Sequence, residues 1–340
     1  MTPEAWLAWF GEHRGDVSVV ADDGAGNSLR YNEDVPRVLA SAIKVVHLLA
    51  YAIAVAEGRL DPEERIRVGD WDAHHPYGGD GLIGAGAHHT ALSGLGVACD
   101  EYGLAKDPEE CVPLGHIAEA MIACSDNAAP DYFRARLGDE ALRDAAARAG
   151  WPDPDLRPFC GETILSYFPD HEDRYETHRT ACTALAERFG TDPGFRRQVL
   201  ARVDGEPIPA GDEWAWTRHT ARGTAADLFA LHQTVANERF RPAEAGAIAR
   251  RILSLPLAHR VPAGAAEVLA KGGSLPRILT TALDVRWPDG RAGTVVALLE
   301  DVPEGHGAAL TDLCLGVLTE PARFADLTQA LRPGSRPRAG

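Results

Sequence analysis

Ser41 and Lys44 stand three residues apart in "VLASAIKVVHLLAYA", the stretch from Val38 to Ala52. Residues i and i+3 of a helix share one face, so the lysine amine can reach the serine hydroxyl. A serine needs a base to become a nucleophile, and a lysine can be that base if burial and neighbouring positive charge lower its pKa. The pair predicts a nucleophilic serine with a lysine base. Taken alone, S-x-x-K is a weak signal, and the alternative is a helix-start serine beside an unrelated lysine.

Lysine is rare in this chain. Of its 34 lysine and arginine residues, only Lys44, Lys106 and Lys271 are lysines. Arginine cannot act as a base because its guanidinium stays protonated in proteins. Lys271 opens "KGGSLPRILTTALDV", where a lysine and two glycines begin a predicted strand, and a third stretch, "CSDNAAPDYF", places Ser125 just before a predicted helix. A chance occurrence explains the three stretches together less well than it explains S-x-x-K alone.

In this order, the three stretches resemble the serine β-lactamase and penicillin-binding protein superfamily, with its S-x-x-K, S-D-N and K-T-G motifs. The chain is most similar to class A β-lactamases, and the resemblance covers nearly its whole length, including "GRLDPEERI" and "TARGTAADLFAL". It implies an α/β (α+β) fold of the β-lactamase/transpeptidase type. In that fold an antiparallel sheet flanked by helices is built from both termini, and an all-helical lobe is inserted between them.

The resemblance also implies roles for single residues. Ser41 corresponds to the acylated nucleophile and Lys44 to its activating base or proton relay. Ser125 corresponds to the hydroxyl that passes a proton to the leaving nitrogen. Asn127 corresponds to the amide that binds both the lysine and the substrate, whereas Asp126 is expected to be structural and to bond the loop backbone.

On the substrate-binding strand, Lys271 is expected to keep a positive potential near Ser125 and a substrate carboxylate. The backbone N–H groups of Ser41 and Ser274 would form the oxyanion hole, in which one donor contributes about 10²- to 10³-fold in rate. The residues expected to bind substrate are Asn127, Lys271, Gly273, Ser274, Ser166 and Arg277.

Deacylation in class A enzymes uses a glutamate and an asparagine in a loop pattern like E-P-x-L-N. Here "GETILSYF" begins at Gly161, 36 positions after Ser125, and offers Glu162 and Ser166 in that spacing. Glu162 is the predicted general base, and the alternative is a solvated loop acid. The pattern departs from the family because Thr163 replaces the proline, Ser166 replaces the asparagine, and no arginine precedes the glutamate.

A second departure is Gly272, which stands where the family has threonine or serine. That hydroxyl would bind a penicillin carboxylate, and its absence removes a charge-assisted hydrogen bond. Binding of penicillin-type β-lactams is therefore in doubt. Arg277 could supply a compensating charge, and its alternative is a solvated arginine.

These features favour a serine hydrolase that acts on an amide, β-lactam or ester of a small molecule or peptide. The alternatives are an acyltransferase, or a non-catalytic ligand-binding member of the same superfamily. No cofactor and no metal are expected. The formal net charge of -16 argues against nucleic acid or an anionic membrane surface as a partner. The oligomeric state is not predicted.

The first residues, "MTPEAWLAWFGEHRGDV", lack a basic region followed by a long apolar core, so a cytoplasmic location is expected. Six cysteines without C-x-x-C pairing favour reduced thiols. They are Cys99, Cys111, Cys124, Cys160, Cys182 and Cys314.

The periodicity predicts elements that could position these residues. "DVSVVADD" and "SLRYNED" should form a hairpin, residues 42–57 a buried helix, and "EVLAKGG", "ILTTALDVRW" and "AGTVVALLE" consecutive antiparallel strands. Helices are predicted at 114–122, 130–137, 139–149, 175–189, 224–236, 242–253 and 308–318. Residues 151–174 should be an irregular loop. The sheet lobe is expected to comprise 14–40 and 212–331, the helical lobe 41–211, and a disordered tail 332–340.

An insertion at about 71–96 is rich in glycine and histidine, and a long surface loop over the substrate cleft is expected there. Its histidines are His74, His75, His88 and His89. Zinc binding is the less favoured alternative, because the histidines form adjacent pairs and no cysteine joins them.

Overall fold

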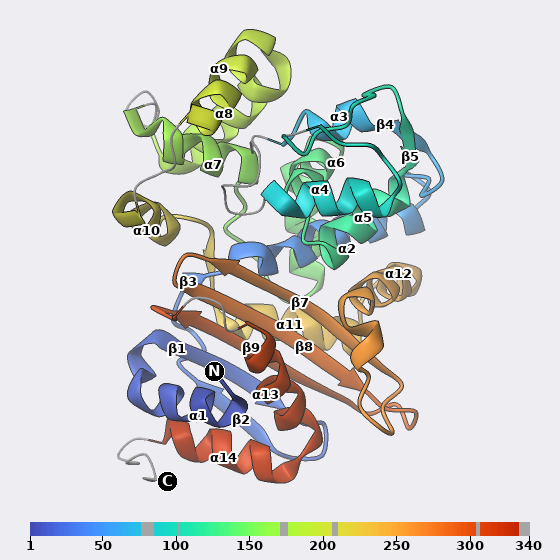
Figure 1. Ribbon diagram of the computed structural model, residues 1–340. Helices are drawn as coiled ribbons and strands as arrows, with labels where there is room; N and C mark the ends of the chain where they lie inside the picture. Colours follow the sequence, from blue (N-terminus) through green and yellow to red (C-terminus); the bar gives the residue numbers. More distant parts are fainter. Residues whose placement is uncertain (76–84, 101, 171–175, 206–209, 304–306, 333–340) are drawn as a thin grey trace. The chain divides into compact units, whose positions relative to one another are not determined.

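The computed structural model describes residues 1–75, 85–100, 102–170, 176–205, 210–303 and 307–332 (Figure 1). Contacts divide the chain into two compact units. The sheet unit comprises Met1–Ile43, Ala146–Pro154 and Ala221–Gly340, and the helical unit comprises Lys44–Ala145 and Asp155–Thr220. In the sequence-based prediction, the helical lobe begins at residue 41 and the sheet lobe resumes at residue 212. In the structure, the helical unit begins at residue 44, the sheet unit resumes at residue 221, and residues 146–154 also belong to the sheet unit. The predicted tail, apart from Arg332, lies outside the described residues.

The sheet unit contains a five-stranded sheet in the order β2-β1-β9-β8-β7, with every neighbouring pair antiparallel. The strands are β1 (Val17–Asp22), β2 (Ser28–Tyr31), β7 (Glu267–Leu275), β8 (Ile278–Arg286) and β9 (Ala292–Glu300). The predicted hairpin and the three consecutive strands near the end of the chain are confirmed. Because β1 pairs with β9, the sheet joins the two ends of the chain, as the sequence predicts.

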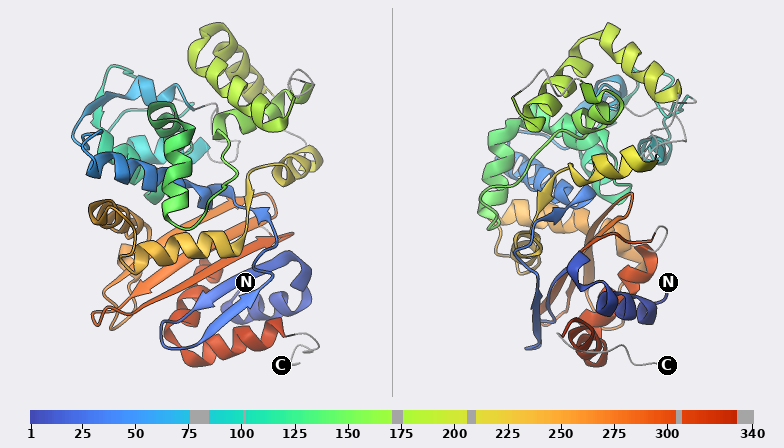
Figure 2. Two further views of the ribbon diagram at one scale, coloured as in Figure 1. Left: turned by 180° about the vertical axis from the view of Figure 1, so that it is seen from behind. Right: turned by 90° about the vertical axis from the view of Figure 1, so that its left-hand side faces the viewer.

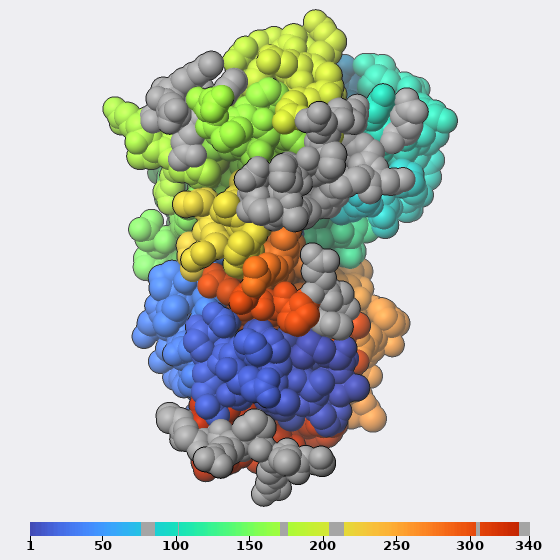
Figure 3. Space-filling view, turned by 60° about the vertical axis from the view of Figure 1, so that its left-hand side comes forward, coloured from blue at the N-terminus to red at the C-terminus, as the bar shows by residue number. Residues whose placement is uncertain are grey.

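Side chains alternate between the two faces of the sheet, and each face is covered by its own helices (Figure 2). One face includes Val19 and Ala297, which share a hydrophobic core with Trp6 and Leu313. The helices on this face are α1 (Pro3–Glu12), α13 (Gly307–Thr319) and α14 (Pro321–Leu331), and those on the other are α11 (Ala225–Ala236) and α12 (Ala243–Leu253). The first and last helices were not predicted, and they pack side by side (Figure 3).

The sheet unit also holds short elements that lead to the predicted nucleophile. β3 (Arg37–Val38) pairs antiparallel with β6 (Arg222–Gly223). The 3₁₀ turns are η1 (Arg14–Asp16), η2 (Ala40–Ile43) and η4 (Leu255–Arg260). The chain passes directly from η2 into the first helix of the helical unit.

That helix, α2 (Lys44–Ala56), is buried from its first residue to Ala54, which confirms the prediction of a helix buried on all sides. It ends before Gly58, whose φ of 70° suits glycine. The other helices are α3 (Val68–Asp72), α4 (Ala85–Gly94), α5 (Leu114–Ala123), α6 (Ala128–Arg148), α7 (Phe159–Tyr167), α8 (His178–Thr191), α9 (Pro193–Gly205) and α10 (Ala210–Arg218), and β4 (Arg65–Arg67) pairs with β5 (Cys111–Pro113). Among the described residues, no helix combines the length and apolar character needed to cross a membrane.

Two loop predictions are wrong in part. The insertion at 71–96 contains α4, and only its residues 76–84 lie outside the described residues. The segment 151–174 contains α7, although its prolines suggested a loop. Both errors have one physical cause, because partners distant in sequence stabilise these short helices. The carboxylate of Asp131 accepts hydrogen bonds from the first N–H groups of α7, and His88 of α4 lies in a buried ion-pair network.

Candidate active site

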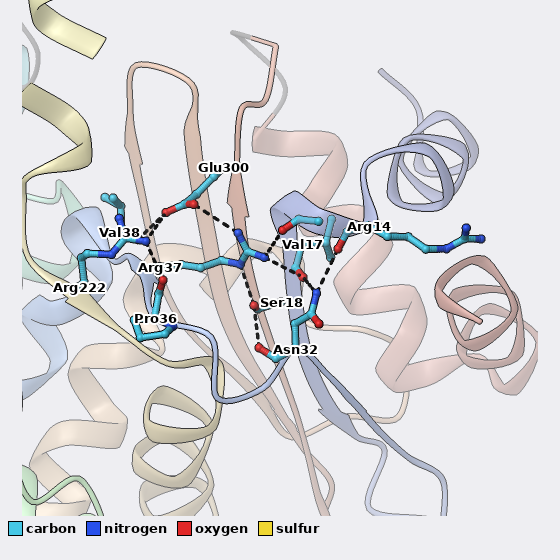
Figure 4. Close-up of polar contacts among 10 residues, drawn as sticks. Arg14, Val17, Ser18, Asn32, Pro36, Arg37, Val38, Arg222 and Glu300 are labelled. Carbon is cyan, nitrogen blue, oxygen red and sulfur yellow. Dashed lines mark hydrogen bonds and ion pairs between the residues drawn. The ribbon is translucent and has the colours of Figure 1, made fainter. Parts of the chain in front are cut away.

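The chain just before the predicted nucleophile is held by a buried arginine (Figure 4). The Arg37 side chain is only 3% exposed. Its Nε donates to Oγ of Ser18 at 2.7 Å, and its Nη2 donates to the backbone oxygen of Gly15 at 2.6 Å. Its Nη1 lies 3.3 Å from the carboxylate of Glu300 at the end of β9. These bonds tie β3 to the strands of the main sheet.

Glu300 extends this network toward β6 (Figure 4). Its Oε1 accepts from the Val38 N–H and from Nη2 of Arg222, both at 3.1 Å. The same guanidinium donates to the Pro36 oxygen at 2.6 Å. The backbone that leads to Ser41 is therefore fixed on both sides of β3.

Ser41 lies in η2, where its backbone approaches β7 closely. A Cβ atom added to Gly273 would lie 2.4 Å from the Ser41 nitrogen, so only glycine leaves room there. Thr280 of β8 donates from Oγ1 toward the oxygens of Leu39 and Gly273, each at 3.1 Å. Ala40 has a φ of 47°, a conformation that non-glycine residues rarely adopt. The sheet unit therefore holds the backbone of Ser41 against the K-G-G strand.

The K-G-G strand also explains one departure from the family pattern. A Cβ at Gly272 would lie 2.9 Å from the Thr280 oxygen, a distance that real Cβ atoms do not show. Any side chain here requires β7 or β8 to shift. The close pairing of β7 with β8 at this position therefore accounts for the absence of a hydroxyl side chain.

The two cations of this region that were expected to bind substrate, Lys271 and Arg277, have partners within the protein. Lys271 is buried, and its Nζ donates to the Gly272 oxygen at 2.6 Å. Burial lowers the pKa of Lys271 to about 7. Arg277 lies in the turn between β7 and β8 and forms an ion pair with Asp301.

In the helical unit, Lys44 is fully buried and directed at the S-D-N motif. Its Nζ donates to the Ser125 oxygen at 2.6 Å and to Oδ1 of Asn127, and it lies 3.4 Å from Oγ of Ser125. The ring of Phe159 lies 4.9 Å from the same amine. Helix α2 thus brings the S-x-x-K lysine to both polar residues of a motif 81 positions away.

The S-D-N turn has its own structural support. Ser125 has a φ of 59°, which places it in the left-handed region. Asp126 is fully buried, and its Oδ1 accepts from the Ala129 N–H at 2.6 Å and from Nε1 of Trp71 at 3.0 Å. The expectation that Asp126 bonds the loop backbone is confirmed.

Glu162 lies in the first turn of α7 and is 5% exposed. Its Oε1 lies 3.8 Å from a guanidinium nitrogen of Arg157. The N-terminus of α7 is bound by Asp131 of α6, whose carboxylate accepts from the N–H groups of Phe159 at 3.0 Å and Cys160 at 2.6 Å. Burial outweighs these bonds and raises the pKa of Asp131 to about 7. The helix that carries Glu162 is thereby anchored just beyond the S-D-N motif.

Packing also explains why the residue directly before Glu162 is a glycine. A Cβ at Gly161 would lie 1.9 Å from the Cys182 oxygen of α8, so a side chain cannot fit at this position. Ser166 stands one turn further along α7, where its Oγ donates to the Thr163 oxygen at 2.6 Å. The departures from E-P-x-L-N thus accompany a regular helix.

Comparison with known proteins identifies the family of the chain. The model of the β-lactamase enzyme family matches residues 4–312. The chain belongs to this family. No curated protein matches it.

Solved structures of β-lactamases share the fold at low identity. A β-lactamase from Sphaerobacter thermophilus is 16% identical with a TM-score of 0.57, over 96% of this chain and 95% of that one. A class A β-lactamase from Bacteroides cellulosilyticus is 14% identical with a TM-score of 0.57, over 97% and 99%. The structure of PBP-A is 16% identical with a TM-score of 0.55, over 94% and 96%. The chain thus has the fold of the serine β-lactamase and penicillin-binding protein superfamily.

Within this family member, each unit brings part of the predicted site together. Lys44, Ser125 and Asn127 meet in the helical unit, whereas Ser41 and Gly273 meet in the sheet unit. All six cysteines are free thiols, as predicted. In the described part of the chain, no group of three or more histidine, cysteine, aspartate or glutamate side chains could hold a metal ion.

Sequence reasoning missed three residues that support the site, namely Asp131, Thr280 and His88. Asp131 stands in "SDNAAPDYF", where an acid four residues after the motif was the available signal. Thr280 lies opposite Gly273 in the strand register, which follows once the hairpin of β7 and β8 is aligned. His88 was noted among the histidines of the insertion, but nothing in the sequence indicated its partners Asp72 and Asp126.

Proposed function

We propose that this β-lactamase family member is a serine hydrolase that forms an acyl-enzyme at Ser41. The observation that carries the proposal is the contact of the Lys44 amine with Ser125 and Asn127 inside the helical unit. A buried lysine held by two polar side chains of S-D-N is suited to proton transfer. Ser41 stands three residues before Lys44, the first residue of α2. Its backbone is held by the strands of the sheet unit.

The proposed acylation moves one proton in a closed cycle. The neutral Lys44 amine takes the proton of Ser41 as Oγ bonds to the substrate carbonyl carbon. When the carbon–nitrogen bond breaks, Oγ of Ser125 gives a proton to the leaving nitrogen and receives one from the Lys44 ammonium. The backbone N–H groups of Ser41 and Ser274 stabilise the oxyanion.

Deacylation in this proposal uses Glu162. A water molecule attacks the acyl ester while the Glu162 carboxylate takes one of its protons. The ester carbon–oxygen bond then breaks, and Ser41 leaves with that proton. Product acid and free enzyme result.

The substrate is proposed to be an amide, lactam or ester of a small molecule or peptide. One mutant of PBP-A has been solved as an acyl-enzyme complex with penicillin G. Here the cations that could bind a carboxylate are engaged elsewhere, because Lys271 donates to Gly272 and Arg277 pairs with Asp301. This arrangement favours substrates that do not depend on a carboxylate bound at the K-G-G strand.

An acyltransferase is the second candidate. It is favoured by the Glu162 region, where a helix and Ser166 replace the irregular loop and the asparagine of class A enzymes. In that case the acyl group passes from Ser41 to an acceptor other than water.

The mass of the intact protein over time tests the proposal. With a panel of β-lactams and activated esters, the wild type is expected to gain the mass of the acyl group and then lose it. Ser41→Ala should gain none, since the acylated atom is gone. A persistent adduct would favour the transferase, and an adduct of equal yield in Ser41→Ala would contradict acylation at Ser41.

Glu162→Gln is expected to separate the two chemical steps. The adduct should form at nearly the wild-type rate, but its clearance should slow by about 10²-fold or more, because an amide cannot accept the proton of the attacking water. Glu187→Gln, on the exposed side of α8, is the control and should clear normally. Clearance at the wild-type rate in Glu162→Gln would rule out this glutamate as the base.

A further inference from the structure

His88 of α4 is buried between two carboxylates of the helical unit. Its Nδ1 lies 2.7 Å from Oδ2 of Asp126, and its Nε2 lies 2.8 Å from Oδ1 of Asp72. The His88 and Asp126 side chains are both fully buried. Asp126 is the central residue of the S-D-N motif, between Ser125 and Asn127. A histidine of the insertion therefore contacts the motif that meets Lys44.

Both carboxylates are also bonded elsewhere. Oδ2 of Asp72 accepts from the Ala105 N–H at 3.0 Å. Oδ1 of Asp126 accepts from the Ala129 N–H at 2.6 Å and from Nε1 of Trp71 at 3.0 Å. A continuous chain of polar contacts thus runs from the backbone after α4, through the histidine ring, to the start of α6.

The charges of the three side chains fit an arrangement in which His88 bridges Asp72 and Asp126. A neutral imidazole has one N–H, so donation to two carboxylates requires the protonated ring. Burial alone would lower the pKa of His88, but the charge and hydrogen bonds of Asp126 and Asp72 raise it to about 9. Despite its burial, the pKa of Asp126 falls to about 2 beside His88. His75 stacks on His88 at 4.4 Å, and burial followed by the His88 charge holds the pKa of His75 well below its usual value.

We propose that His88 is a positioning residue that acts through Asp126 to hold the S-D-N turn in the conformation that meets Lys44. Ser125 needs such support, because non-glycine residues keep a positive φ only where their surroundings enforce it. With both of its oxygens engaged, Asp126 leaves the preceding serine little freedom. We call this support of the S-D-N turn by His88 and Asp126 the brace. The effect on rate rests on the proposed function, whereas the effect on the turn does not.

His88→Gln tests the bridge, because glutamine can donate to one carboxylate but carries no charge. The single-turnover acylation rate constant is expected to fall by about 10- to 100-fold, the effect of misplacing reacting groups by up to about 1 Å. The half-saturating probe concentration should stay within about threefold. His89→Gln, at the exposed neighbouring histidine, should match the wild type in both quantities.

Two outcomes of the rate measurements would overturn the proposal. One is a lower Tm of His88→Gln with an unchanged acylation rate well below that Tm, which would mean a purely structural histidine. The other concerns Asp126→Asn, alone and combined with His88→Gln. If His88 acts through Asp126, the double variant should be about as slow as the slower single variant, and fully multiplicative effects would contradict this route.

Amide hydrogen exchange gives a readout that needs no reaction. In His88→Gln, the amides of residues 124–129 are expected to exchange at least about tenfold faster than in the wild type, with no change in His89→Gln. Unchanged exchange would refute the brace. Faster exchange in a protein that no probe acylates would support the brace and count against the proposed function alone.

The pH dependence of Tm tests the charge on the bridge. The groups that face His88 are Asp72, Asp126, His75 and Trp71. Because its pKa is raised on folding, the stability due to protonated His88 is complete below about pH 6.5 and is lost as pH rises through about 9. The Tm difference between wild type and His88→Gln should shrink over this range. A constant difference would contradict the charged bridge.

Discussion

Lys44→Arg is expected to lower the acylation rate constant by about 10²- to 10⁴-fold, although it conserves the positive charge. Lys44 is fully buried, and its amine contacts Ser125 and Asn127 within 3.4 Å. A guanidinium cannot give up its proton, so it cannot accept one from Ser41. Its planar fork also does not fit a site shaped around a compact ammonium. Single-turnover acylation, followed by intact mass or by an ester chromophore, measures the effect.

Lys106→Arg is the matched control, since it makes the same exchange at an exposed lysine. It should acylate at the wild-type rate and retain the wild-type Tm. If Lys44→Arg kept more than about a tenth of the wild-type rate, proton relay through Lys44 would be refuted. Circular dichroism must show that the variant is folded, and a variant that is folded, binds probe and does not acylate is the expected result.

Gly273→Ala is expected to have a comparably large effect from the sheet unit. The added methyl carbon would lie 2.4 Å from the Ser41 nitrogen, 2.9 Å from Oγ1 of Thr280 and 3.0 Å from Cβ of Ala40. The backbone of either η2 or β7 must then move. Because the Ser41 N–H is a proposed oxyanion donor, acylation should slow by about 10²- to 10³-fold. Overpacking should also lower the free energy of unfolding by about 1–3 kcal/mol.

Gly15→Ala provides the control for an added methyl group in the same unit, because nothing lies within 4 Å of its Cβ position. It should leave acylation unchanged. The two effects of Gly273→Ala are measured separately. Denaturant unfolding gives the loss of stability, and the acylation rate is measured at low temperature, where the variant is folded. Near-normal acylation in Gly273→Ala would show that the nucleophile does not depend on this close approach.

The three motifs illustrate how far sequence reasoning reaches. S-x-x-K, S-D-N and K-G-G occur in a family-specific order, and that order led to the correct fold. The strands near both termini follow from their alternation of apolar residues, and α2 follows from an apolar run that a helix in a globular fold must bury. The meeting of Lys44 with Ser125 and Asn127 could be expected only through the resemblance, because 81 and 83 positions separate these residues.

The parts that could not be predicted depend on partners far apart in the chain. Helix α7 forms between prolines because Asp131 accepts its first N–H groups, and no local pattern announces that bond. Likewise, the insertion had the composition of a loop. Its four histidines were noted, but His88 was not predicted to be a partner of Asp126.

By itself, the sequence determined the antiparallel sheet, which local periodicity encodes, and the family, which follows from the resemblance of three motifs in their order. It also supplied the residue types of the proposed active site. Only the tertiary structure decided which groups those residues contact. It showed Lys271 bonded to Gly272, Arg277 paired with Asp301, and His88 bridging Asp72 and Asp126. The physical reason is that burial, hydrogen bonding and charge pairing depend on distance in space, which the order of residues along the chain does not specify.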